Sequence, residues 1–165
     1  MSDDVTRRLG QPELEAIFER SPFMRFMGLE VLRVDHAQST LAVRMPIRPE
    51  FERGRAGSQQ FHGGAIASLI DVVGDFAIGM MVGGGVPTMN LRIDYLRPGV
   101  GAYLDGTATV RRTGRTSAVV DIEIAGADGT RVVSEATPKR ESHPTSRSPP
   151  CSGGVRAGSM LSVQT

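Results

Sequence analysis

Apolar residues recur at helical spacing in two parts of the chain. Leu14, Ile17 and Phe18 fall on one face of a short segment that ends at Ser21, and this pattern predicts a helix near the N-terminus. A second segment, residues 63–81, is apolar almost throughout. A helix that is apolar on every side is typical of a protein core or of a membrane span.

Charged residues argue against a membrane span in the second segment. Residues 65–86 are long enough to cross a bilayer, but Asp71 and Asp75 lie within them. A carboxylate at the centre of a bilayer costs about 2.5–3.5 kcal/mol even on a lenient insertion scale. We therefore expect a buried helix and no membrane partner.

Alternating apolar and polar residues predict six strands, two before the long helix and four after it. The predicted strands are residues 28–35, 39–45, 88–96, 102–112, 116–125 and 130–135. The apolar row of the third strand consists of Met89, Leu91, Ile93 and Tyr95, and that of the fifth consists of Ala118, Val120, Ile122 and Ile124. Asp128-Gly129 predicts a tight turn before the sixth strand, and residues 46–60 predict a long surface loop.

An antiparallel sheet with one apolar face needs a cover, which the long helix can supply. The expected fold class is therefore α+β, with a six-stranded antiparallel sheet wrapped around one long central helix. A length of 165 residues is sufficient for one domain. We divide the chain into an N-terminal helical segment (1–21), a domain (22–137) and a tail (138–165). The tail is rich in Pro, Ser and Gly without hydrophobic period, which predicts disorder and little contribution to stability.

Charge and cysteine usage narrow the classes of function. The chain has 19 Lys and Arg against 18 Asp and Glu, so we expect no nucleic-acid partner. The single cysteine, Cys151, can form no internal disulfide and has no neighbours at metal-ligand spacing. The N-terminus is acidic and lacks the apolar stretch of a secretory signal. We expect a cytoplasmic protein without a metal.

The segment from Phe61 to Asp71 is the most informative for chemistry. A helix that begins at two glycines, Gly63 and Gly64, exposes backbone N–H groups that can stabilise a developing oxyanion. Asp71 lies in the same helix among apolar neighbours, where a carboxylate is costly without a purpose or a partner. Asp71 is a candidate general base or nucleophile. On these residues alone, a buried carboxylate bonded to backbone or to a serine is the simpler interpretation.

His62-Gly63-Gly64, the Asp nine residues after that His, and a strand that ends in Arg97-Pro98 together resemble one enzyme family. These features are similar to the hotdog-fold acyl-CoA thioesterases of the phenylacetate-degradation (PaaI-like) type, in the 4-hydroxybenzoyl-CoA thioesterase superfamily. The resemblance covers about residues 22–135. It implies a homodimer or a homotetramer built as a dimer of dimers. It also implies an acyl-CoA substrate, with coenzyme A as part of the substrate and no further cofactor.

The resemblance assigns roles by position. Gly63 matches the residue whose amide polarises the thioester carbonyl, and Asp71 matches the carboxylate that activates water or attacks directly. Thr88 matches a position near the attacking water. The family often has Asn or Gln six residues before the His, where this chain has Ala56. Gln59 and Gln60 are the candidate replacements.

The resemblance also suggests substrate contacts. Arg111, Arg112 and Arg115 flank a turn whose cations meet the phosphates of coenzyme A in the family, although a solvated strand end explains them equally well. The candidates for the acyl slot are Phe61, Met80, Met81 and Met89, with Gly64 beside the reacting group. The last family strand usually runs past the position of Glu135, whereas Ala136-Thr137-Pro138 interrupts it here.

Three further features have simpler structural interpretations. His62 could act as a general base, but an imidazole just before a helix more simply bonds loop backbone. Asp75, one turn after Asp71, could share a proton or a cation with it, although a structural place near a dimer axis is favoured. Gly83-Gly84-Gly85 lacks the ending of a phosphate loop and is better explained as a helix stop.

The sequence therefore predicts hydrolysis of acyl-CoA thioesters to free acid and coenzyme A. Two alternatives remain open: a hotdog-fold enoyl-CoA hydratase or dehydratase that uses His62 and Asp71, and a non-enzymatic acyl-CoA-binding protein. Both aromatic and medium-chain acyl groups are compatible with the sequence.

Overall fold

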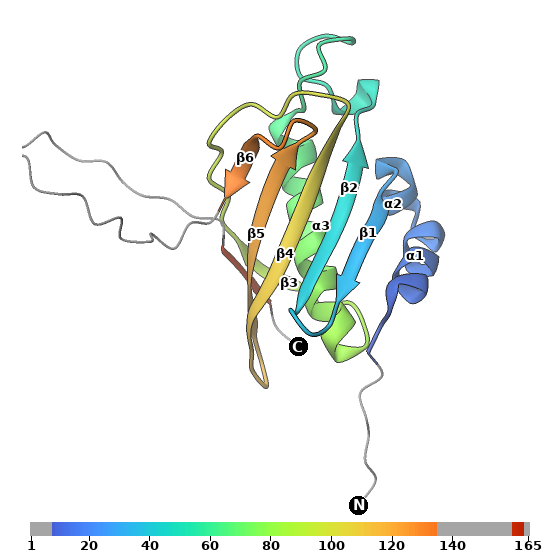
Figure 1. Cartoon of the computed structure of the whole chain (residues 1–165), viewed down its shortest axis with the longest axis vertical. Helices are drawn as coiled ribbons and strands as arrows, with labels where there is room; N and C mark the ends of the chain where they lie inside the picture. Colours follow the sequence, from blue (N-terminus) through green and yellow to red (C-terminus); the bar gives the residue numbers. More distant parts are fainter. Residues whose placement is uncertain (1–7, 135–159, 164–165) are drawn as a thin grey trace, which may run out of the picture.

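One long helix lies against one face of an antiparallel sheet (Figure 1). The computed structural model describes residues 8–134 and 160–163. The helix is α3 (Gly63–Val82), as predicted. The strands are β1 (Glu30–Asp35), β2 (Thr40–Pro46), β3 (Thr88–Leu91), β4 (Tyr103–Thr113), β5 (Ala118–Gly126), β6 (Arg131–Ser134) and β7 (Met160–Val163). The predicted α+β class and the sheet around a central helix are confirmed.

The core lies between α3 and the sheet. The predicted apolar row of β5, from Ala118 to Ile124, is at most 1% exposed. From α3, Leu69, Ile70 and Val73 have no exposed side-chain surface. α3 has the length and apolarity of a membrane span, but most of it is buried inside this domain. The helix is apolar because it is surrounded by protein.

Two short helices precede the sheet. The first, α1 (Gln11–Arg20), is the predicted N-terminal helix, and it buries Leu14 and Phe18. The second, α2 (Pro22–Met27), was not predicted. Pro22 ends the first helix but also begins the second, because proline is well suited to a first helical position. A short 3-10 helix, η1 (Pro49–Phe51), lies in the predicted long loop.

Among the described residues, the sheet has seven strands, whereas the sequence predicted six. Their order is β1-β2-β4-β5-β7-β3, and β6 also pairs with β5. Glu123 of β5 pairs with Ser134, and Asp121 pairs with Met160. If the strand continued without interruption after Ser134, position 136 would pair with Asp121; position 160 takes that place instead. β6 and β7 are two parts of one strand position, with residues 135–159 between them in sequence.

The extra strand corrects part of the predicted tail. Residues 160–163 pair with β5 and β3, although the composition of 138–165 predicted disorder. The remainder of that tail, including Cys151, lies outside the described residues. The interruption predicted at Ala136-Thr137-Pro138 also lies outside the described residues.

β3 is shorter than the predicted strand 88–96, and it lies at the edge of the described sheet. Of its predicted apolar row, Met89 and Tyr95 are 54% and 49% exposed, whereas Leu91 and Ile93 are partly buried. The chain after β3 rejoins the sheet at Tyr95, which bridges to Val133. The row is half exposed because no further strand covers this edge.

Candidate active site

The N-terminus of α3 carries the predicted His-Gly-Gly motif. His62 is the N-cap residue, and its Nδ1 accepts a hydrogen bond of 3.0 Å from the Gly64 N–H. The His62 N–H donates to the carbonyl of Phe51 at 2.7 Å. These contacts give His62 the structural role that its position favoured. Within the described part of the chain, the Gly63 N–H has no protein acceptor, so it can donate to a ligand.

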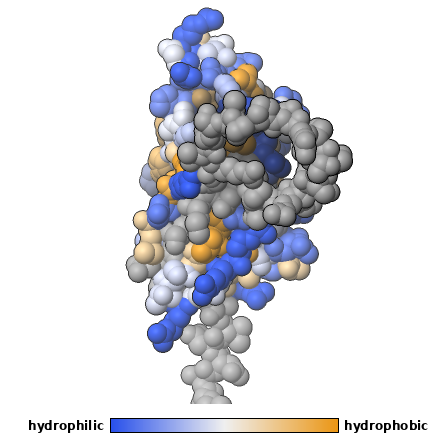
Figure 2. All heavy atoms as spheres, turned by 90° about the vertical axis from the view of Figure 1, so that its left-hand side faces the viewer, coloured by the Kyte–Doolittle hydropathy of each residue, from blue (hydrophilic) through white to orange (hydrophobic). Residues whose placement is uncertain are grey.

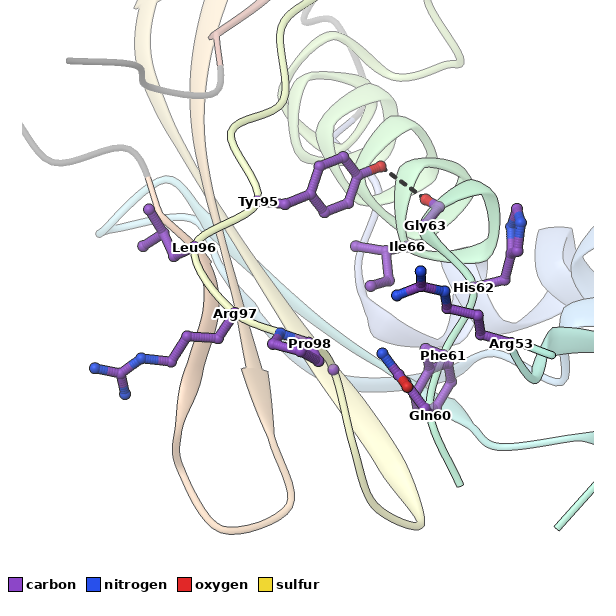
Figure 3. A pocket seen from close by; sticks show the side chains of 11 residues that line it. Arg53, Gln60, Phe61, His62, Gly63, Ile66, Tyr95, Leu96, Arg97 and Pro98 are labelled. Atoms are coloured by element: carbon purple, nitrogen blue, oxygen red, sulfur yellow. Dashed lines mark hydrogen bonds between the residues drawn. The ribbon is translucent and has the colours of Figure 1, made fainter. Parts of the chain in front are cut away.

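Tyr95 contacts the same turn of α3. Its hydroxyl donates to the Gly63 carbonyl at 2.7 Å, as the dashed line in Figure 3 shows. Partial burial of the phenol raises the pKa of Tyr95. This contact ties the segment after β3 to the first turn of α3. Alternation places Tyr95 in an apolar row, and no pattern in the sequence indicates its contact with Gly63.

Asp71 and Thr88 are brought together across the site. The Thr88 hydroxyl, on the first residue of β3, donates to Oδ1 of Asp71 at 2.7 Å. Both residues are partly exposed. The hydrogen bond occupies one carboxylate oxygen of Asp71 and orients the group, so the second oxygen can accept from water or substrate.

Asp75 lies one turn further along α3. Its Oδ1 accepts a hydrogen bond of 2.7 Å from the Val86 N–H. Burial, with a smaller contribution from the nearby Asp71, raises the pKa of Asp75 to about 6, although the Val86 bond opposes the rise. Asp75 therefore anchors the chain that leads into β3.

A cavity of about 470 Å³ lies beside Gly63. Its lining includes two cations, Arg53 and Arg97, together with Gln60 and Phe61. In Figure 3, Arg53 extends over the opening near Gly63, whereas the Arg97 guanidinium points away from it. Neither arginine was predicted as a site residue. Arg53 belongs to the long loop, and Arg97 follows the strand whose ending was noted as part of the motif.

The two candidate amides differ in position. Gln60 lines this cavity, whereas Gln59 is absent from its lining. The backbone of Gln59 has a left-handed φ of 53°, and its N–H donates to the Glu52 carboxylate at 2.8 Å. Gln60 is therefore the better placed replacement for the family amide.

A second cavity, of about 420 Å³, lies beside the same helix start. Its wall combines three phenylalanines with polar side chains, and His62 borders both cavities. The phenylalanines are Phe23, Phe26 and Phe51, and the polar residues are Glu50, Glu52, His62 and Ser68. Phe23 and Phe26 are 50% and 48% exposed. The start of α3 thus separates a cavity with arginines from a cavity with aromatic side chains.

The other residues predicted to contact substrate do not lie at the start of α3. Arg111, Arg112 and Arg115 lie around the β4–β5 turn, at the opposite end of the sheet from the start of α3 (Figure 1). Arg111 forms an ion pair with Asp121. Within one chain, these arginines are therefore not brought to Gly63. Met89 is exposed on β3, and Met80 is fully buried in the core, which removes Met80 as a slot residue.

Metal chemistry has no evident place among the described residues. In residues 8–134 and 160–163, there is no group of three or more His, Cys, Asp or Glu placed to hold a metal ion. The groups that this region offers for chemistry are a backbone N–H donor at the start of α3 and, in the middle of the same helix, the Asp71 carboxylate with the Thr88 hydroxyl on it.

Known proteins resemble this chain in sequence and in fold. A family model of the thioesterase superfamily matches residues 60–133. The medium/long-chain acyl-CoA thioesterase YigI of Salmonella typhimurium is 31% identical over 126 residues, which cover 65% of this chain and 77% of YigI. The acyl-coenzyme A thioesterase PaaI of Escherichia coli is 31% identical over 110 residues, which cover 66% of this chain and 74% of PaaI.

Solved structures agree. The PaaI structure from Escherichia coli superposes with a TM-score of 0.61 at 28% identity, over 73% of this chain and 83% of PaaI. A thioesterase from Haemophilus influenzae shares the fold, with a TM-score of 0.71 at 15% identity, over 96% of this chain and 92% of that one. The fold and the site define a hotdog-fold thioesterase. The chain belongs to the thioesterase superfamily and is an acyl-CoA thioesterase of the PaaI-like type.

Proposed function

We propose that this enzyme hydrolyses acyl-CoA thioesters at the start of α3, with the Gly63 amide as oxyanion donor and Asp71 as general base. The observation that carries the proposal is the 2.7 Å hydrogen bond from Thr88 to Asp71. It orients a carboxylate on a partly exposed face of α3. The Gly63 N–H, with no protein acceptor among the described residues, supplies the complementary group.

The proposed reaction uses these groups in order. Asp71 takes a proton from water as the water oxygen attacks the thioester carbonyl carbon. The carbonyl oxygen gains negative charge and accepts a hydrogen bond from the Gly63 N–H at the positive end of α3. The C–S bond then breaks, and the thiolate of coenzyme A takes up the proton. Loss of one such oxyanion donor typically costs about 2.7–4 kcal/mol in the barrier.

Helix geometry requires two chains for this site. Gly63 and Asp71 are eight residues apart, so at about 1.5 Å per residue they lie roughly 12 Å apart along α3. Reacting atoms must approach to about 3–3.5 Å. A thioester on Gly63 therefore needs Asp71 of a second copy. We propose a homodimer in which two α3 helices run antiparallel about a two-fold axis and form two equal sites.

The surface of the chain supports such a dimer. Along α3, the residues at helical spacing that keep exposed surface are Gly64, Ala67, Ser68, Asp71 and Asp75, mostly small residues that allow close approach. On the side drawn in Figure 2, hydrophobic surface lies amid hydrophilic surface. Large apolar side chains in and after β3, namely Met89, Leu96 and Val100, are 53–54% exposed. Exposed apolar surface of this kind is typical of interfaces.

The two cavities suggest how the substrate lies. We propose that the phosphates of coenzyme A lie at the cavity that Arg53 reaches, since guanidinium groups bind phosphate well. The acyl group would then occupy the aromatic cavity of Phe23, Phe26 and Phe51 on the other side of the helix start. Its volume falls within the usual range of about 300–1,000 Å³ for ligand pockets. YigI is named as a medium/long-chain acyl-CoA thioesterase, and acyl groups of that length are compatible with an apolar slot.

Mixing two inactive variants tests the shared site. Asp71→Asn removes the base, and Gly63→Pro removes the oxyanion donor. The Gly63→Pro exchange is conformationally suitable, because Gly63 is the first helical residue and His62 has an extended ψ of 140°, as a residue before proline requires. A mixed dimer contains one doubly damaged site and one intact site. We expect re-equilibrated mixtures to regain activity that neither parent shows.

Subunit exchange must be demonstrated in the same experiment, for example with differently tagged parents that co-purify. Both parents must also show the parental circular dichroism spectrum. If mixed dimers form from folded parents and no activity returns, Asp71 and Gly63 do not cooperate across subunits. The shared-site proposal is then wrong.

A further inference from the structure

The connection between α3 and β3, residues 83–87, determines where Thr88 lies. It begins with three glycines, and Gly83 adopts a left-handed conformation with φ of 86°. Glycines have no side chains to pack and allow many backbone conformations. Contacts with α3 must therefore hold this connection in place.

Its first part is held by backbone contacts. The N–H groups of Gly83 and Gly84 donate to the Gly79 carbonyl at 2.8 and 3.1 Å. The approach is so close that a Cβ on Gly79 would lie 2.8 Å from the Gly84 carbonyl oxygen. These contacts end the helix, but they act four residues or more before Thr88.

Its second part is held by a side chain. The Val86 N–H donates to Oδ1 of Asp75 at 2.7 Å, and Val86 itself is buried. Asp71, one turn earlier on the same helix, accepts from the Thr88 hydroxyl. Two successive carboxylates of α3 thus hold two points of one short segment. Pro87 lies between these points and fixes its own φ, so a displacement at Val86 is passed on to Thr88.

We propose that Asp75 is a positioning residue for thioester hydrolysis: its hydrogen bond to the Val86 amide sets the place of the Thr88 hydroxyl on Asp71. The proposal rests on the role proposed above for Asp71. Asp75 acts through the backbone of residues 86–88 and does not contact the reacting atoms. A carboxylate at this position is therefore useful to catalysis although it lies on the helix that already carries the base.

Three substitutions at this position separate positioning from other roles. Asp75→Asn keeps an oxygen that can accept from Val86, and it should retain kcat within about threefold of the parent, since the hydrogen bond persists. Asp75→Ala removes the acceptor and should lower kcat about tenfold at unchanged KM, within the hundredfold loss that a 1 Å misplacement can cause. Asp75→Ser keeps a polar group too short to reach Val86 and should behave like Asp75→Ala. It provides a second measurement if the alanine variant fails to fold.

A double-mutant cycle with Thr88→Val gives the decisive measurement. If Asp75 acts through Thr88, Asp75→Ala causes no further loss of kcat in the Thr88→Val background. Equal losses in both backgrounds would overturn the proposal, and so would an Asp75→Asn variant as impaired as Asp75→Ala. The Asp71→Asn variant distinguishes failure of the role proposed for Asp71 from failure of the role proposed for Asp75. If it stays active, the role of Asp71 is wrong; if it is inactive while Asp75→Ala retains parental kcat, the Asp75 proposal alone fails.

Discussion

The Thr88 hydroxyl donates to Oδ1 of Asp71 across 2.7 Å, between the first residue of β3 and the middle of α3. A hydroxyl and a carboxylate 17 positions apart in sequence meet because the glycine-rich connection after α3 turns the chain back along the helix. The bond leaves the second carboxylate oxygen of Asp71 available for water.

Replacing Asp71 by Asn should leave the fold intact and lower kcat by about 100- to 10,000-fold, the range for loss of a general base. Thiol release from an acyl-CoA measures the rate, and a thermal melt checks the fold. A single turnover of the parent in ¹⁸O-labelled water adds mechanistic detail. A general base puts the label in the product acid at the first turnover and none in Asp71. A nucleophilic Asp71 forms an anhydride, and attack of water on the Asp71 carbon of that anhydride leaves the first product acid unlabelled and the label in Asp71.

His62 should be replaceable by Asn. Asparagine is a favoured N-cap residue and can accept from the Gly64 N–H as Nδ1 of His62 does. We expect His62→Asn to keep Tm and kcat near the parental values. His62→Ala should lose about 1 kcal/mol of stability, the usual cost of an absent cap, and its Tm should fall by a few degrees. An inactive but well-folded His62→Asn would show that the imidazole takes part in the chemistry.

Arg53 should contribute to affinity for coenzyme A. Its replacement by Ala removes a charge-assisted contact to phosphate and should raise KM for an acyl-CoA about tenfold, equivalent to about 1.4 kcal/mol. KM for the same acyl group on N-acetylcysteamine, which lacks phosphates, should not change. Arg112→Ala, at the far end of the sheet, is the matched comparison. A larger effect of Arg112→Ala would place the phosphates at the β4–β5 turn, as the sequence first suggested.

Asp75 should make stability depend on pH. Its pKa is raised from 3.8 to about 6 in the folded protein, so the folded state binds a proton more tightly than the unfolded state. The contribution of this group to stability is therefore present at low pH and is lost as pH rises from about 4 to about 6. Asp75→Asn lacks this dependence. The Tm of the parent minus that of Asp75→Asn should decrease between pH 4.5 and pH 7.5; a constant difference would contradict the prediction.

The C-terminal strand should matter for stability and turnover. Truncation after Ser159 removes β7, which pairs with both β5 and β3. Several ladder hydrogen bonds at about 1 kcal/mol each are lost, and Tm should fall by roughly 5–10 °C. kcat should also fall, because β3 carries Thr88. Truncation after Val163 keeps β7 and serves as the control. If the two truncations behave alike, β7 contributes nothing to the sheet.

Much of the fold was predictable because strong periodicity determines it. The apolar segment 63–81 and the β5 row from Ala118 to Ile124 bury their side chains as their patterns indicate. β7 was not predictable, because four residues inside a Pro-, Ser- and Gly-rich segment carry too little pattern to indicate a strand. Its pairing depends on the part of β5, residues 118–121, that β6 does not pair with.

The candidate site was predictable in part. The His-Gly-Gly motif predicted the helix start at Gly63, and the resemblance singled out Asp71 and Thr88, which the structure brings into hydrogen-bonding contact. The contact of Tyr95 with Gly63 required the path of the chain after β3, which alternation cannot give. Arg53 is brought to the cavity by a long loop, and no periodicity describes the course of such a loop.

The divided strand position also has a consequence for synthesis on the ribosome. β3 pairs with β7, and Thr88 is registered against Val163. At about 5–20 residues per second, the 75 positions between them take roughly 4–15 s to translate. During that interval, β3 emerges from the exit tunnel as a strand without its partner, and unpaired strands readily associate with other chains. Chaperone demand during translation should therefore be greater for this chain than for a variant in which the sheet closes directly after β6.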